Sequence, residues 1–94
     1  MNLSLDYDNT YTRDPAMWDS IIEVMKQHGH TVYVVTLRTP SEGDDVRRYL
    51  ADKVESIIFT SRNAKMDCVQ MLGISIDIWI DDMPWFILHD AKPA

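Results

Sequence analysis

Strand-like and helix-like segments alternate along the whole chain, and this alternation constrains the fold more than any single motif. Residues 31–35 are rich in β-branched side chains, which is typical of a buried strand. Isoleucines at alternate positions of residues 74–80 indicate another strand, and shorter apolar segments at 2–5 and 54–60 indicate two more. The resulting order β-α-β-α-β-α-β predicts a parallel four-stranded sheet with right-handed crossovers and helices on both faces.

The helices between these strands have recognisable starts. Asp14 can cap the first helix, Pro15 suits its first position, and Gly29 is a natural end. Ser41 and Asp44 resemble a capping box for the second helix. We therefore expect two helices of ordinary length before the third strand.

A third helix is expected after residue 60, with Ser61 as its cap. Its inner face is predicted to carry Ala64, Cys68, Met71 and Leu72. A final helical turn is predicted at residues 85–88, and residues 90–94 are expected to fray.

Composition narrows the class of protein. The 94 residues suit one domain, 1–94, and the net charge of −6 argues against nonspecific binding to nucleic acid or to an anionic membrane. No apolar run reaches transmembrane length and no signal-peptide pattern is present. A single cysteine excludes an intramolecular disulfide. We expect a cytoplasmic protein that does not bind membranes, and the sequence leaves homo-oligomerisation open.

Chemically useful side chains follow the predicted strands. Asp6 follows the first strand, Thr36 the second and Asp81 the fourth, while Lys65 comes soon after the third. The carboxyl ends of parallel strands meet at one edge, where ligands bind in such sheets. If the backbone stays extended, Asp6 and Asp8 point the same way, and two adjacent carboxylates require a cation or a shared proton. An all-oxygen site of this kind suits Mg²⁺, although a polar turn is the simpler reading of the motif alone.

In this order, the motifs resemble those of the haloacid dehalogenase (HAD) superfamily. The likeness rests on Asp6-Tyr7-Asp8-Asn9-Thr10, Thr36, Lys65 and Asp81-Asp82, and it covers nearly the whole chain. It implies a Rossmann-like three-layer α/β/α sandwich with strand order 4-1-2-3 and no cap domain. It also implies a Mg²⁺-dependent phosphatase that forms an aspartyl-phosphate.

The resemblance implies a role for each of these residues. Asp6 would be the nucleophile, and Asp8 would be the general acid and then the general base. Thr36 would hydrogen-bond a phosphoryl oxygen beside the Leu37 amide, and Lys65 would neutralise the developing charge. The metal ligands would be Asp6, Asp8 through its backbone carbonyl, and Asp81, with Asp82 a second ligand or an outer partner. The candidate substrate-binding residues are Asn9, Thr10, Leu37 and Arg38.

Asp8 and the position of Lys65 distinguish this chain from dehalogenases and from receiver domains, and Asn9 departs from the usual family pattern. An acid at Asp8 favours a phosphatase over a dehalogenase, because the dehalogenases of the family lack it. Asn9 stands where the family often has glycine, a substitution that the left-handed tolerance of asparagine allows. A receiver domain would place its lysine last in the chain, whereas Lys65 precedes Asp81.

Other functions stay open at this point. A catalytically weak or inactive domain that binds metal or protein would retain much of the same pattern, and a phosphatase acting on nucleic-acid ends is a further alternative. The connections are too short to hold a folded lid, so the site is expected to be open to a phosphorylated substrate of unknown size. Arg13 and Arg38 are candidate contacts at the site edge, and Trp85 and Phe86 are candidate contacts for a partner or second subunit.

Overall fold

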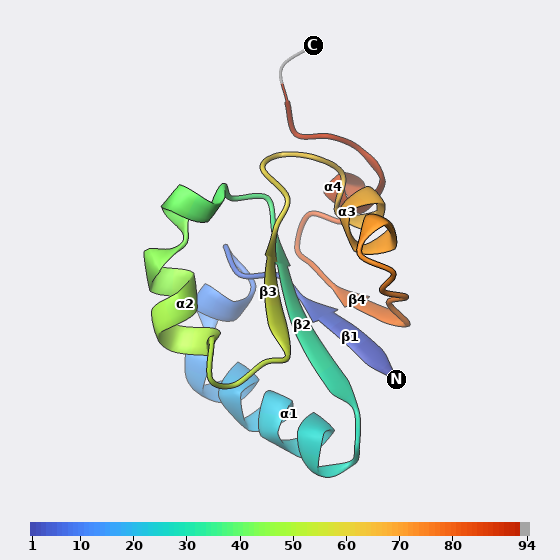
Figure 1. The fold of residues 1–94 in the computed structure, drawn as a ribbon. Coiled ribbons are helices and arrows are strands. Elements are labelled where there is room, and N and C mark those ends of the chain that lie inside the picture. The colour runs from blue at the N-terminus through green and yellow to red at the C-terminus, as the bar shows by residue number, and fades with distance from the viewer. Residues whose placement is uncertain (93–94) are drawn as a thin grey trace.

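Four parallel strands form the central sheet in the computed structural model, which describes residues 1–92 (Figure 1). They are β1 (Asn2–Leu5), β2 (Thr31–Thr36), β3 (Ser56–Phe59) and β4 (Ile78–Ile80), all paired in parallel. The predicted parallel sheet is thus confirmed. The hydrogen-bonded order is β3-β2-β1-β4, and the predicted 4-1-2-3 names the same neighbours from the opposite edge. Residues 90–94 were predicted to fray, but the Asp90 carboxylate accepts from the Ala64 amide at 2.7 Å and the Ala91 amide donates to the Arg62 carbonyl at 2.8 Å, so the prediction is wrong for this part of the segment. Residues 93 and 94 lie outside the described residues.

The sheet has a hydrophobic cluster on each of its faces. Val34 and Val35 are adjacent in β2 and fully buried, and they belong to different clusters because successive side chains of a strand point to opposite faces. Val34 packs with Ile22 of α1 (Pro15–Gln27) and Leu50 of α2 (Asp44–Leu50). Val35 packs with Val69 of α3 (Lys65–Met71).

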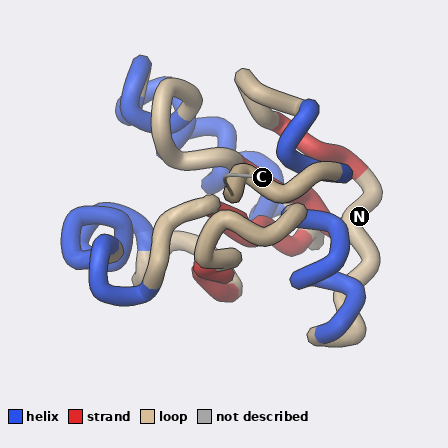
Figure 2. Tube along the Cα trace, turned by 90° about the horizontal axis from the view of Figure 1, so that it is seen from above, coloured by secondary structure: helices blue, strands red, loops and turns tan. Residues whose placement is uncertain are grey.

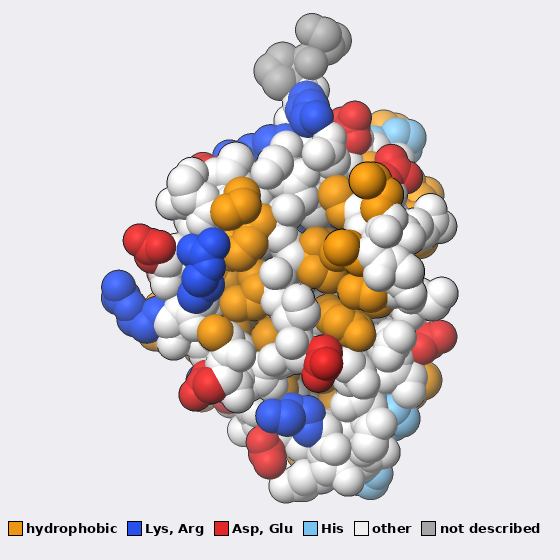
Figure 3. Space-filling model, viewed as in Figure 1, with side chains coloured by type: hydrophobic (Ala, Val, Ile, Leu, Met, Phe, Trp, Pro, Cys, Tyr) orange, Lys and Arg blue, Asp and Glu red, His pale blue; other side chains and the backbone are white. Residues whose placement is uncertain are grey.

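The same division is visible in the arrangement of the helices. In Figure 1, α1 and α2 lie on one side of the strands, with α3 and α4 (Trp85–Leu88) on the other, and Figure 2 shows helices on both sides from above. β3 is an edge strand, and hydrophobic side chains reach the surface on both sides of it in Figure 3. No helix within residues 1–92 is long and apolar enough to cross a membrane.

The fourth strand is shorter than predicted. Residues 74–77 are not part of it, because β4 pairs only with β1 and that strand begins at Asn2. Asp77 closes the ladder, with its amide donating to the Asn2 carbonyl at 2.8 Å and its carboxylate accepting from the Asn2 amide at 2.7 Å. Ile74 and Ile76 instead pack against the Val69 cluster. Their alternation therefore marked partly buried positions rather than a paired strand.

The first helix begins as predicted, whereas the second does not. The Asp14 carboxylate accepts a hydrogen bond from the Met17 amide, and Pro15 is the first residue of α1. The capping box predicted at Ser41 and Asp44 is wrong. A short 3₁₀ turn, η2 (Pro40–Glu42), intervenes, and the Glu42 carboxylate accepts from the Thr39 amide at 2.8 Å. Pro40 favours this early turn because its φ is already fixed in the helical range.

The third helix also begins later than predicted. Ser61 and Arg62 both have positive φ, 52° and 69°, so Ser61 cannot act as a helix cap there. The helix starts at Lys65, and the Asp90 carboxylate accepts a hydrogen bond from the Ala64 amide that precedes it.

The residues of α3 that are buried differ from those predicted. Lys65 and Val69 face inward, one turn apart, and the preceding Ala64 is buried as predicted. Met71 and Leu72 were predicted on the inner face, but they are 87% and 61% exposed. The correction matters for function, because it places the amino group of Lys65 inside the protein.

Candidate functional site

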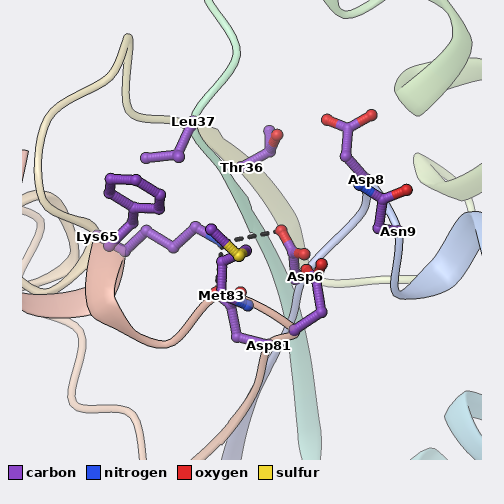
Figure 4. A pocket seen from close by; sticks show the side chains of 10 residues that line it. Asp6, Asp8, Asn9, Thr36, Leu37, Lys65, Asp81 and Met83 are labelled. Atoms are coloured by element: carbon purple, nitrogen blue, oxygen red, sulfur yellow. Dashed lines mark hydrogen bonds and ion pairs between the residues drawn. The ribbon is translucent and has the colours of Figure 1, made fainter. Parts of the chain in front are cut away.

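A pocket of about 130 Å³ lies at the carboxyl edge of the sheet (Figure 4). It collects side chains from the ends of β1, β2 and β4 and from the start of α3. Its lining residues are Asp6, Asp8, Asn9, Thr36, Leu37, Lys65, Asp81, Asp82, Met83 and Phe86. The structure therefore brings together every predicted catalytic residue, as well as the predicted metal ligands.

Lys65 is the centre of the site. Its Nζ atom donates to Asp6 Oδ1 at 2.8 Å and to Asp81 Oδ2 at 2.6 Å, and its side chain is 2% exposed. A buried ammonium group is tolerated only when its charge is compensated by nearby acceptors. The dashed lines in Figure 4 mark such contacts. Lys65 thus couples the end of β1 to the end of β4.

Backbone hydrogen bonds hold Asp6 in place independently of its side chain. Its amide donates to the Ile80 carbonyl at 2.9 Å, which extends the pairing of β1 and β4 by one residue. Its carbonyl then accepts from the Tyr11 amide at 3.2 Å, so the chain turns away from the sheet directly after it. This geometry leaves the Asp6 carboxylate at the floor of the pocket, where it is buried.

Thr10 joins two carboxylates instead of standing free for a substrate. Its hydroxyl lies 3.0 Å from Asp6 Oδ2 and 3.2 Å from Asp82 Oδ1, and it accepts from the Asp82 amide at 3.3 Å. One hydroxyl hydrogen can serve only one of these carboxylates at a time. Thr10 was predicted to bind substrate, but it is absent from the pocket lining and its hydroxyl is engaged within the protein.

The carboxylates in the site strongly affect one another's protonation. Burial, followed by the hydrogen bond with Asp82, raises the pKa of Asp6 from its ordinary value of 3.8 to about 7, although Lys65 acts in the opposite direction. The hydrogen bond with Asp6 lowers the pKa of Asp82. Without a further cation, the Asp6 carboxyl therefore takes up a proton at a higher pH than an ordinary aspartate does.

The same three carboxylates are suitable ligands for a divalent cation. Asp6, Asp81 and Asp82 each offer an oxygen, and these atoms lie within 4.8 Å of one another. Hard cations such as Mg²⁺ prefer oxygen ligands, and a bound cation would favour the ionised form of Asp6, which burial disfavours. The donor set is thus compatible with a hard divalent cation and does not distinguish Mg²⁺ from others.

Asp8 does not point toward Asp6, so that part of the sequence prediction is wrong. Residues 7–10 form a turn, and Asn9 adopts a φ of 61°, the left-handed conformation expected from asparagine at this position. The Asp8 carboxylate accepts from Arg38 Nε at 3.0 Å and from Arg38 Nη2 at 2.8 Å. Figure 4 shows Asp8 separated from Asp6 and Asp81, although it still lines the pocket. The Asp8 side chain is not part of the three-carboxylate cluster.

Arg38 is occupied by protein groups rather than open to a substrate. Besides Asp8, its guanidinium binds Asp45 at 2.6 Å and the Glu42 carbonyl at 2.8 Å, and it lies over the Tyr7 ring. The hydrogen bonds with Asp8 raise the pKa of Arg38 above its ordinary value. Arg38 is absent from the pocket lining, so its predicted substrate contact becomes a role in holding Asp8.

Thr36 and Leu37 lie where the sequence predicted them. Thr36 is 1% exposed and lines the pocket, and Leu37 lines it beside Thr36 (Figure 4). Arg62 holds this loop, because its amide and its Nη1 donate to the Leu37 carbonyl at 2.8 and 2.7 Å. No local sequence pattern indicates that role, since it depends on two residues 25 positions apart.

Two other residues complete the surroundings of the site. Met83 lines the pocket and was not predicted, although it directly follows the acidic pair, and its amide donates to Asp81 Oδ1 at 2.9 Å. Arg13 lies outside the pocket, in a neighbouring groove of about 350 Å³ that Asp14 and Asp81 also line. Arg13 was predicted to contact a substrate at the edge of the site, but it lines this neighbouring groove instead of the pocket.

Comparisons of this chain with protein-family models, with curated proteins and with solved structures find no match. The likeness to the HAD superfamily therefore stays a prediction. It rests on the identity, order and placement of the site residues.

The raised pKa of Asp6 predicts a pH-dependent difference in stability between the wild-type protein and Asp6→Asn. Between about pH 4 and pH 7, the folded wild type retains a proton on Asp6 that its unfolded chain has released. Because the folded state binds more protons in this range, Asp6 makes wild-type stability fall as the pH rises. Asp6→Asn lacks this contribution. Its free energy of unfolding in EDTA should therefore increase relative to that of the wild type as the pH rises through this range. Urea titrations at several pH values test this, and parallel pH curves for the two proteins would contradict it.

Proposed function

We propose that this protein is a Mg²⁺-dependent phosphatase of the HAD type, which hydrolyses phosphate monoesters through an aspartyl-phosphate on Asp6. The observation that carries the proposal is the ion pairing of buried Lys65 with both Asp6 and Asp81 in the pocket at the carboxyl edge of the sheet. This arrangement joins a carboxylate nucleophile, a cation and a candidate metal ligand in one site. The two clusters on opposite faces of the sheet support a Rossmann-like three-layer α/β/α architecture for the same proposal.

The first step is a displacement at phosphorus. A carboxylate oxygen of Asp6 forms a bond to phosphorus while the bond from phosphorus to the ester oxygen breaks, and the electron pair leaves with that oxygen. Lys65 donates hydrogen bonds where negative charge gathers, and Thr36 lines the pocket beside it. Bound Mg²⁺ would add neutralisation of the charge shared by the carboxylates and the phosphoryl group, with Asp6, Asp81 and Asp82 as its candidate ligands.

The second step returns Asp6 to its initial state. A water oxygen forms a bond to phosphorus, the bond from Asp6 to phosphorus breaks, and the electron pair returns to the Asp6 carboxylate. Asp8 lines the pocket and is the candidate group that accepts the water proton, after donating one to the leaving oxygen in the first step. Arg38 binds both oxygens of Asp8 and so fixes the position of this carboxylate at the pocket wall.

Turnover of an aryl phosphate provides the direct test. Purified protein with millimolar Mg²⁺ should release phosphate from p-nitrophenyl phosphate, and excess EDTA should remove the activity. Asp81→Asn should lower turnover by at least about 100-fold, because it removes a metal ligand and a partner of Lys65. Asp44→Asn is a matched control, because the Asp44 side chain is 92% exposed and lies outside the pocket. Activity that is indifferent to EDTA and to Asp81→Asn would refute the proposal.

A further inference from the structure

We propose that the pocket selects phosphate monoesters whose group next to the phosphate is apolar or aromatic and carries no second negative charge. This inference rests on the proposed phosphatase function and names its substrate class. It is carried by the apolar lining of the pocket, which consists of Leu37, Met83 and Phe86. It is also carried by the distribution of charge around that lining.

The apolar lining is held in place by the segments that build the site. Leu37 directly follows Thr36, and its carbonyl is fixed by Arg62. Met83 is tied to Asp81 through its amide, and its own carbonyl accepts from the Phe86 amide at 3.1 Å. These contacts fix the backbone from which the three side chains reach the pocket, so the part of a substrate nearest the phosphate would meet an apolar lining.

Phe86 and Trp85 are neighbours in α4 but have different surroundings. Phe86 is half-buried and lines the pocket. Trp85 is 64% exposed, does not line the pocket, and stacks on His89 with ring centroids 3.8 Å apart. The sequence does not distinguish these two aromatic residues, whereas only Phe86 lines the pocket in the structure.

Charge around the pocket disfavours a second anionic group on the substrate. Among the described residues that line it, Lys65 is the only cation, and both Asp6 and Asp81 already bind it. Arg38 is outside the lining and bound to Asp8 and Asp45. A carboxylate or second phosphate beside the reacting group would therefore meet acidic side chains without a free protein cation to pair with it, and a bound Mg²⁺ would already be shared by the carboxylates and the reacting phosphate. Like charges brought together this closely repel.

Binding of nonhydrolysable phosphonates tests the selection without relying on turnover. Calorimetric titrations with Mg²⁺ would compare benzylphosphonate, methylphosphonate and 4-carboxybenzylphosphonate. Wild-type protein should bind benzylphosphonate about 5-fold or more tightly than methylphosphonate, because a ring buries apolar surface on the lining. It should bind the carboxylated analogue about 10-fold more weakly than benzylphosphonate, because of like-charge repulsion.

Variants then show which residue causes the preference for benzylphosphonate. Phe86→Ala should remove most of the preference for the benzyl group, and Phe86→Leu should retain part of it. Trp85→Ala, on the same helix but outside the pocket, should leave it unchanged. Phe86→Lys should favour the carboxylated analogue, because it adds the missing cation.

The outcomes separate this inference from the phosphatase proposal. Equal affinity for the three phosphonates, or no binding of any of them, overturns the inference even if phosphate esters are hydrolysed. Selective binding without hydrolysis of any ester supports the inference and refutes only the phosphatase proposal. Loss of the preference in Trp85→Ala but not in Phe86→Ala would also overturn it.

Discussion

Asp6→Asn should lower Mg²⁺-dependent turnover of an aryl phosphate by at least about 1,000-fold, because the amide cannot act as the nucleophile that the proposed mechanism requires. The fold should persist. Asparagine has nearly the same shape, the backbone contacts of residue 6 with Ile80 and Tyr11 do not involve the side chain, and Lys65 retains Asp81 as a partner. Removal of a buried charge should also make the metal-free variant at least as stable as wild type at pH 8, because the pKa of Asp6 is raised to about 7.

The measurement combines initial rates with thermal melts recorded by circular dichroism. Asp44→Asn serves as a control for loss of an aspartate, since its exposed side chain has no part in the pocket. Near-native turnover by a pure preparation of Asp6→Asn would show that Asp6 is not the nucleophile. Loss of turnover together with loss of the cooperative melt would instead show a structural role for the Asp6 carboxylate.

The parts of the fold that could be predicted from the sequence are those fixed by neighbouring residues. β2 follows from a run of β-branched residues, and the start of α1 follows from Asp14 and Pro15, which act within one helical turn. The start of α3 could not be predicted in this way. The left-handed backbone at Arg62 is held by the Leu37 carbonyl, 25 residues away, so no local pattern indicates it.

The candidate site could likewise be predicted from the sequence only in part, because some of its contacts join distant residues. The parallel sheet brings strand ends to one edge, and this rule alone placed Asp6, Thr36 and Asp81 together. The directions of the Asp8 and Arg38 side chains could not be predicted from the sequence. Asp8 turns toward Arg38 because the chain bends at residue 7, and Arg38 itself is oriented by Asp45 of α2. Those contacts join residues that are distant in sequence, so spacing within the first motif could not show them.

Lys65→Met should destabilise the metal-free protein by about 3–5 kcal/mol at pH 8, because it removes the cation from a buried ion pair and leaves the carboxylates of Asp6 and Asp81 without it. Methionine has a similar length, so lost packing contributes little. The loss should be smaller near pH 4, where protonation of carboxylates removes the charge that Lys65 compensates. Urea unfolding at the two pH values measures both effects.

A matched lysine and a metal titration show whether charge is the cause. Lys53 pairs with Asp19 at 3.0 Å, but its side chain is 37% exposed, so Lys53→Met should cost only about 1 kcal/mol or less. Mg²⁺ should raise the melting temperature of Lys65→Met more than that of wild type, because a cation bound by Asp6, Asp81 and Asp82 replaces part of the missing charge. Lys65→Met and Lys53→Met of equal stability would contradict the central place of Lys65 in the site. An equal Mg²⁺ shift in Lys65→Met and wild type would mean that the cation binds elsewhere, because a cation within the acidic cluster must respond to the loss of a charge 2.8 Å from Asp6.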